Sequence, residues 1–431
     1  MAGRREQIAR ARAEATEARL AGHDLPAGGA WVTAARRAAL GRVQDLGLPD
    51  RRDEYWKYTD PSALIAPAPQ SVAPEVTVGL FEAADAVRLV FVDGRFDAAA
   101  SDDPAVAGLE VERLADAAVR DIHWARDIYG LLEARGQAPV ARSLAALNTA
   151  MAGDGVLIRA TGKAMRPVSL IYRHTDADAD AVLHHCVRLE PGAEVTLLEQ
   201  GTPGARGNVV LEVDVADDAR FHHVRFQGAD HGRATLTHVF ARVGAGAAFK
   251  SFTATVGGRL TRNECVLELA GPEGIAHVAG TALGGAGVHQ DDTVFITHAA
   301  EGCESRQVYK KVLRGGARGV FQGKILVHRD AQLTDGYQIS QSLLLDEDSQ
   351  FLAKPELEIY ADDVKCSHGS TSGAIDPVAL FYLRSRGLPE VEAQALLVLA
   401  FLAEALEEIE DDAFADEIRG RLEQSLGQDR V

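Results

Sequence analysis

Four stretches of sequence, PGAEVTLL (191–198), DDARFHHV (217–224), AGAAFKSF (245–252) and PEGIAHV (272–278), place a turn of small residues directly before a strand-like run. The small residues Ala193, Ala219, Ala247 and Gly274 recur at nearly even spacing, roughly 27 residues apart. Between each pair lies a second strand-like run, at 209–215, 235–243 and 264–270. Two strands in each repeat of this length are typical of a solenoid, in which every coil stacks its strands on those of the next coil.

The sequence on either side of this repeat divides the chain into three parts. Residues 1–152 read as a mainly helical domain with a hairpin at 87–96, whose turn is Asp93-Gly94. Strand-like runs then continue from 155 to about 366, although the interval blurs after 285. We therefore predict a mainly β fold, with a β-helix core at 153–368 and a C-terminal helical domain at 369–431. A pair of β-sandwiches is the alternative. The C-terminal helices are expected to cap the solenoid and protect its open edges.

Composition narrows the class of protein. The chain has 431 residues and a formal net charge of −18, which argues against nucleic acid as a partner because phosphate binding needs a basic surface. Four widely spaced cysteines form no disulfide framework and indicate a reducing compartment. We read no signal peptide at the N-terminus and no run long enough to span a membrane. These features predict a cytoplasmic protein without a membrane partner.

The segment YADDVKCSHG (360–369) contains the best chemical candidates. Residues two apart in a strand point to the same face, so Cys366 and His368 present a thiol and an imidazole side by side. Such soft donors suit a transition metal. Two donors cannot close a four-coordinate site, so a metal held here needs further ligands from elsewhere in the fold or from a second subunit.

The other motifs give weaker evidence for a functional site. The run 315–324 fails as a phosphate loop because Arg318 stands where a glycine is required, and no GxSxG elbow is present. Asp291-Asp292 point to opposite faces of a strand and are expected to be solvated edge residues. His184-His185 and His222-His223 are expected to be polar surface histidines. The aromatic stretch YWKY (55–58) is expected to anchor a loop onto its domain, with a partner-contact patch as the alternative.

Two of these segments carry a resemblance. YADDVKCSHG (360–369) followed by LFYLRSRG (380–387) resembles the C-terminal signature of the SufB/SufD family of the SUF iron–sulfur cluster assembly machinery, and WKYT (56–59) resembles its N-terminal aromatic motif. The resemblance covers essentially the whole chain. It implies a right-handed parallel β-helix between helical end domains. The absence of a cysteine cluster favours the SufD branch over the SufB branch.

The resemblance also implies partners and site residues. A SufD-type chain pairs with SufB through the β-helices and binds the ATPase SufC through its C-terminal region. The family's functional histidine corresponds to His368, with Cys366 as a helper, and the ATPase contact corresponds to Phe381, Tyr382, Arg384 and Arg386. The implied role is a non-enzymatic scaffold with no stably bound cofactor of its own and a transient iron–sulfur cluster at the SufB interface. Participation of a reduced flavin is left open.

Two other functions remain as alternatives. The first is an exported-type β-helix enzyme acting on carbohydrates, although the carboxylates are poorly placed for an acid/base pair. The second is a structural homodimer, in which edge strands pair across a two-fold axis.

Overall fold

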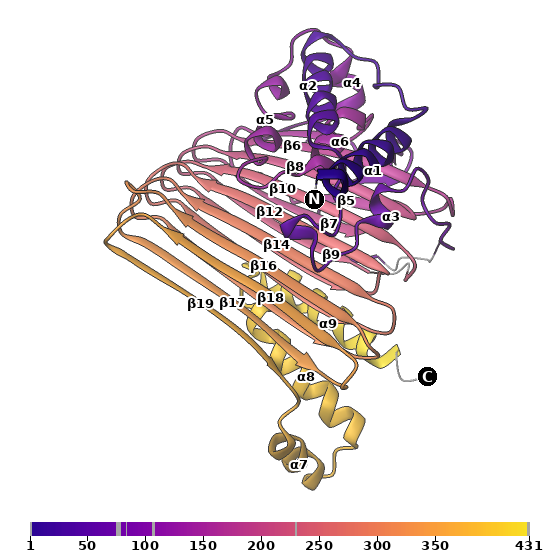
Figure 1. Cartoon of the computed structure of the whole chain (residues 1–431). Coiled ribbons are helices and arrows are strands. Elements are labelled where there is room, and N and C mark those ends of the chain that lie inside the picture. Colours follow the sequence, from indigo (N-terminus) through magenta and orange to yellow (C-terminus); the bar gives the residue numbers. More distant parts are fainter. Residues whose placement is uncertain (1, 75–78, 83, 106–107, 229–230, 429–431) are drawn as a thin grey trace.

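Two long sheets face each other through the middle of the chain, and successive strands alternate between them (Figure 1). The structure is a computed structural model that describes residues 2–74, 79–82, 84–105, 108–228 and 231–428. From β4 onward each strand pairs in parallel with the strand two places along the chain, as β10 does with β8 and β12. This is a flattened parallel β-solenoid, so the predicted fold class is confirmed and the β-sandwich alternative is wrong.

Within the described residues, sheet A contains ten strands and sheet B nine. The strands of sheet A are β1 (Val87–Val92), β2 (Arg95–Phe96), β5 (Val168–Arg173), β7 (Glu194–Gly201), β9 (Arg220–Gln227), β11 (Ala248–Val256), β13 (Ile275–Gly284), β15 (Glu304–Leu313), β17 (Thr334–Leu344) and β19 (Val364–Gly373). The strands of sheet B are β3 (Leu109–Arg113), β4 (Val156–Ala160), β6 (Asp180–Leu189), β8 (Arg206–Val215), β10 (Ala234–Val243), β12 (Leu260–Leu269), β14 (His289–His298), β16 (Arg318–Val327) and β18 (Gln350–Ile359).

The register of sheet A reproduces the interval read from the sequence. Phe221 pairs with Phe249, and Phe249 pairs with Ala276, which are the same steps as those between the small residues at 219, 247 and 274. The repeat blurs later because the coils lengthen. Ile275 pairs with Glu304, and Glu304 pairs with Asp335, and both of these steps are longer than the earlier ones. A fixed period therefore identifies the first coils and misses the last ones.

The predicted hairpin is present, but it belongs to the solenoid. β1 and β2 are antiparallel around Asp93 (φ 49°) and Gly94 (φ 77°), the positive φ values of a type I′ turn. β1 also pairs in parallel with β5, while β3 pairs antiparallel with β4. The first part of the chain thus starts both sheets.

The N-terminal helices lie against the first coils of the solenoid (Figure 1). They are α1 (Ala2–Leu20), α2 (Ala30–Leu46), η1 (Glu54–Trp56), α3 (Ser62–Ile65), α4 (Leu114–Ala118), η2 (Trp124–Asp127), α5 (Leu131–Arg135) and α6 (Ser143–Met151). α6 is buried along nearly its whole length against α2 and sheet B. The outer face of sheet B is therefore covered there rather than solvated.

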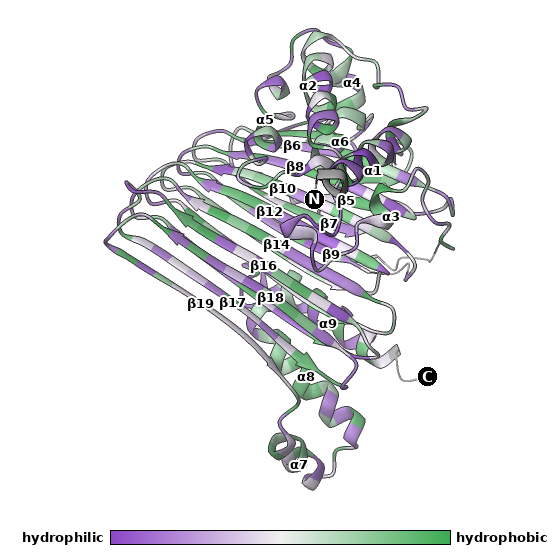
Figure 2. Ribbon diagram, in the orientation of Figure 1, coloured by the Kyte–Doolittle hydropathy of each residue, from purple (hydrophilic) through white to green (hydrophobic). Residues whose placement is uncertain are grey.

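The C-terminal helices are α7 (Pro377–Ser385), α8 (Glu390–Leu406) and α9 (Asp412–Gln428). α8 and α9 pack on the outer face of sheet A, where Leu402 and Ile418 join Phe252 and Val308 in one apolar cluster. They do not cap the end of the solenoid, so that expectation was wrong. The reason is the apolar stripe of α8, which buries more surface on the face of the sheet than on a row of edge hydrogen-bonding groups. Figure 2 shows this stripe in green against a largely polar β19.

The hydrophobic core fills the space between the two sheets. Inward-facing residues of successive coils stack in register, as Val195, Phe221 and Phe249 do in sheet A, and every one of them is buried. Among the described residues, no helix is long and apolar enough to cross a membrane.

Candidate functional site

The solenoid ends in two strands that each have a sheet partner on one side. β18 pairs with β16, and β19 pairs with β17, and in the described part of the chain no strand lies beyond either of them. β19 runs on to Gly373, beyond residue 368, where the β-helix core was predicted to end. Ile359 and Tyr360 beside this edge are 39% and 59% exposed. An uncovered edge of this length can accept strands from another chain.

Cys366 and His368 lie on β19, and the structure gives them different surroundings. Cys366 is half-buried and packs beside Ile325 and Ala361. Burial raises the pKa of its thiol, which keeps the sulfur protonated and weakens it as a metal ligand. His368 is exposed at the open end of the inward-facing row. Among the described residues, the pair belongs to no cluster of three metal-ligating side chains.

The predicted ATPase-contact residues Phe381, Tyr382 and Arg384 lie on helix α7, which projects from the body of the protein (Figure 1), and Arg386 is the C-cap residue of that helix. The Asp376 side chain accepts a hydrogen bond from the Val378 amide at 2.8 Å and caps the helix. Phe381 and Tyr382 are 73% and 56% exposed. Exposed aromatic side chains on a capped helix are typical of a surface that another protein covers.

Arg384 and Arg386 flank these aromatic residues. Arg384 pairs with Glu390 at 3.1 Å, and the Arg386 guanidinium lies 5.1 Å from the ring of Tyr382. Both arginines are exposed, so their charges are available at the surface. The helix therefore presents an apolar and basic surface to solvent.

One group of metal-ligating side chains was missed by the sequence reasoning: His184, Cys186 and Glu212, the buried His–Cys–Glu cluster. It lies on the outer face of sheet B beneath the N-terminal helices. The sequence signal was there, because His184 and Cys186 are two apart on one strand. The prediction of surface histidines was wrong here, since His184 and His185 are both buried.

The hydrogen bonds of this cluster explain what it does. His184 contacts the Asn148 side-chain oxygen through Nδ1 at 3.0 Å and Glu212 through Nε2 at 2.9 Å. Glu212 also accepts from the backbone amides of Gly130 and Glu133 at 2.6 and 2.7 Å. Burial raises the pKa of the Cys186 thiol. Since every strong donor and acceptor is already in use, the residues fit a structural network that holds α5 on the sheet better than a metal site.

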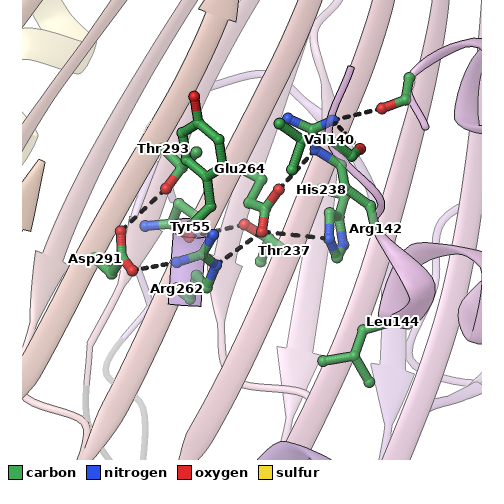
Figure 3. Close-up of polar contacts among 12 residues, drawn as sticks. Tyr55, Val140, Arg142, Leu144, Thr237, His238, Arg262, Glu264, Asp291 and Thr293 are labelled. Atoms are coloured by element: carbon green, nitrogen blue, oxygen red, sulfur yellow. Dashed lines mark hydrogen bonds and ion pairs between the residues drawn. The ribbon is translucent and has the colours of Figure 1, made fainter. Parts of the chain in front are cut away.

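A second buried polar network joins the aromatic motif of the N-terminal segment to sheet B (Figure 3). Glu264 binds Arg142 at 2.8 Å and Arg262 at 2.7 Å, and Arg262 also binds Asp291. Burial acts to raise the pKa of Glu264, but the charge of Arg262, with those of His238 and Arg142, lowers it to about 2. The carboxylate is therefore fully ionised at neutral pH.

The aromatic motif sits directly on this network. The guanidinium of Arg262 lies 4.2 Å from the ring centroid of Trp56, a cation–π contact, and Thr59 donates to Asp291. Tyr55 and Trp56 are buried, so this part of the motif anchors its loop to the sheet as predicted. Asp291 and Asp292 do face opposite ways, but both are buried, so the expectation of solvated carboxylates was wrong. Asp292 binds Lys311 inside the solenoid.

Comparisons with known proteins agree with this architecture. A family model described as "SUF system FeS cluster assembly, SufBD core domain" matches residues 172–401. The chain is 32% identical over 407 residues to the "Iron-sulfur cluster assembly protein SufD" of Escherichia coli, covering 90% of this chain and 91% of that protein. It is 28% identical over 419 residues to an iron-sulfur cluster assembly SufBD family protein of Synechocystis, covering 91% and 89% of the two chains. A SufBD family protein of Mycobacterium tuberculosis is 27% identical over 279 residues, 63% of this chain and 70% of that one.

Proposed function

The chain belongs to the SufBD family of the SUF system for iron–sulfur cluster assembly, and we propose that it acts there as a SufD-type scaffold subunit. In this role it contributes half of an assembly site and a SufB subunit contributes the other half. The iron–sulfur cluster is cargo that forms at the shared interface and leaves. The chain itself is non-catalytic and holds no resident cofactor, and ATP hydrolysis resides in a SufC subunit.

The observation that carries the proposal is the open end of the solenoid. β18 and β19 offer unpaired backbone groups to a second β-solenoid, and His368 is exposed beside them. A single good ligand at a free edge is what one half of a shared site would contribute. Cys366 is a poorer candidate because burial keeps its thiol protonated. We assign it a supporting role.

Helix α7 supports the proposed SufC contact. Its exposed Phe381 and Tyr382 supply apolar area, and Arg384 and Arg386 supply positive charge on an otherwise acidic chain. Aromatic and arginine side chains are the residues that most often dominate protein–protein binding. We also propose a cytoplasmic location for the complex, supported by the four cysteines, Cys186, Cys265, Cys303 and Cys366, which are free thiols.

The proposal is tested by co-expressing the chain with SufB and SufC and purifying the assembly under anaerobic conditions. We expect a stable three-subunit complex and expect His368→Ala to lower its iron and acid-labile sulfide content without loss of the complex. Ser367→Ala is the matched control, since Ser367 is exposed on the same strand and faces the other way. Failure to recover a complex, or unchanged iron and sulfide in the His368 variant, would overturn the assignment.

The SufC contact has a separate test. Phe381→Ala and Tyr382→Ala are expected to weaken SufC retention on an affinity column while SufB retention is unchanged. Val119→Ala is the control, because Val119 is equally exposed (74%) in the N-terminal part of the chain. Equal losses of SufC in all three variants would place the contact elsewhere. The alternative of a structural homodimer is tested by measuring the molecular mass of the isolated chain in solution.

A further inference from the structure

The inward-facing residues of the last two strands of sheet A form a series of paired side chains. Residues 338, 340 and 342 of β17 pair in register with 368, 370 and 372 of β19. Ser340 donates to Ser370 at 3.1 Å, and Ser342 bonds to Ser372 at 2.9 Å. Two of the three rungs are thus closed by a side-chain hydrogen bond. The third rung, Gln338 with His368, is the one next to the proposed assembly site.

Gln338 continues a glutamine ladder that begins one coil earlier. Gln307 and Gln338 are in register on adjacent strands, and both are fully buried. The Gln338 Nε2 atom donates to Gln307 Oε1 at 2.9 Å. Below Gln307 the register partner is Val278, which has no polar group, and Gln307 Nε2 is accordingly without a hydrogen-bond partner among the described residues. The ladder therefore has a direction, with its free donor at the Val278 end.

The other end of the ladder is a free acceptor. Gln338 Oε1 is buried and has no hydrogen-bond partner in the described part of the chain. A buried acceptor without a donor is costly, so native structures leave few of them. The next rung in the same column is His368, the last residue of the column and one with two ring nitrogens.

Gly323, on β16, fixes the place of the Gln338 side chain. A Cβ atom at position 323 would overlap Gln338 Nε2, so the amide occupies the space that the glycine leaves open. The amide group is thus held across the interior of the solenoid, with its donor arm committed to Gln307.

We propose that Gln338 is the positioning residue for His368: its Oε1 accepts the N–H of one ring nitrogen and fixes the tautomer of the imidazole. This inference rests on the proposed function of His368. The other ring nitrogen then carries a lone pair that faces out of the solenoid toward a cluster bound at the interface. An amide does this without adding a charge, unlike the carboxylates that often orient metal-binding histidines.

The tautomer of His368 is measured directly on the full chain. The chain is prepared with isotope-labelled histidine, and proton–nitrogen correlation spectra report which ring nitrogen carries the proton. His368→Gln identifies the signal by its absence. We expect one tautomer in the wild type and a loss of that preference in Gln338→Met, which keeps the volume of the side chain and removes its acceptor. Gln338→Glu is expected to retain the single tautomer. One carboxylate oxygen can accept from Gln307 Nε2 once the Gln307 amide turns, and the other oxygen can still accept from His368.

Ser340→Ala is the matched control, because it removes the neighbouring rung on the same two strands and leaves Gln338 intact. Its His368 signal is expected to match the wild type. The inference is overturned if Gln338→Met leaves the tautomer preference unchanged, or if wild-type His368 shows the mixed tautomers of a solvated imidazole. The measurement on wild-type His368 tests the inference even if the Gln338 variants do not fold. Iron content of the His368→Ala complex is a separate measurement, so the failure of the proposed function is distinguishable from the failure of this inference.

Discussion

Replacing Glu264 by glutamine tests whether the buried ion network holds the N-terminal segment on the solenoid. Glu264 lies between Arg142 and Arg262, and all three side chains are no more than 3% exposed. Glutamine has nearly the same shape, so no cavity is made and the change is one of charge. The substitution removes the carboxylate that the buried Arg142 binds and leaves Arg262 paired with Asp291.

The loss of unfolding free energy in Glu264→Gln can be worked out from the pKa shift of Glu264 and from the usual cost of breaking a buried ion pair. The pKa of Glu264 falls from 4.5 to about 2 in the folded chain, and at 1.36 kcal/mol for each unit this is about 3 kcal/mol of stability. Removing one partner of a buried ion pair costs roughly 3–5 kcal/mol. We expect a loss of about 3 kcal/mol at neutral pH, because the glutamine oxygen still accepts one hydrogen bond.

The sign of the pH dependence follows from the lowered pKa. The contribution of Glu264 is fully present above about pH 4.5, the unfolded value, and is lost as pH falls toward 2. The difference in unfolding free energy between wild type and Glu264→Gln should therefore shrink across that window.

The assay is urea unfolding followed by tryptophan fluorescence. The three tryptophans, Trp31, Trp56 and Trp124, all lie in the first part of the chain, and Trp56 contacts Arg262, so the signal reports on this docking. For a slope of roughly 3 kcal/mol per molar urea, the midpoint should fall by about 1 M. Glu268→Gln is the control, since Glu268 is 42% exposed on the same strand and its pair with Arg135 is at 4.0 Å. A Glu264→Gln midpoint equal to that of the control would refute the reasoning.

Three further outcomes are expected. Added Zn²⁺ should not bind the buried His–Cys–Glu cluster, so calorimetric titration should give the same stoichiometry for wild type and Cys186→Ala; one site fewer in the variant would contradict the structural role. Asp376→Ala should destabilise α7 by about 1 kcal/mol, because it removes the cap, and amide exchange in that helix should quicken several-fold; unchanged exchange would count against the cap. Leu402→Ala should cost roughly 2–5 kcal/mol and release α8 and α9 to limited proteolysis, whereas Leu396→Ala, 48% exposed, should change little.

Most of the fold could be predicted from short sequence patterns. The small residues before each strand, Ala193 through Gly274, mark positions that the structure places in register. Such marks are readable because each coil is a short unit with its own turn. The end of the repeat was lost because the later coils, in which Ile275, Glu304 and Asp335 pair in register, are longer than the coils between Glu194 and Ile275. A period cannot follow a changing length.

The surroundings of individual strands were less predictable. His184 and His223 looked like surface residues, since two adjacent histidines put at least one on each face of a strand. Both faces are buried: His184 contacts Glu212 beneath the N-terminal helices, and His223 lies inside the solenoid 3.8 Å from Glu199. Period-two alternation shows which residues share a face. It does not show that a distant segment covers that face.

The segment with Cys366 and His368 separates the two kinds of information. From the sequence it follows that both residues lie on one strand and that this chain supplies too few ligands for a closed metal site. Only the folded chain shows that Cys366 packs inward, that His368 ends a column of stacked side chains beside Gln338, and that no described strand pairs beyond β18 and β19. These facts depend on contacts between residues that lie one full coil apart in the sequence, and a linear pattern carries no record of such contacts.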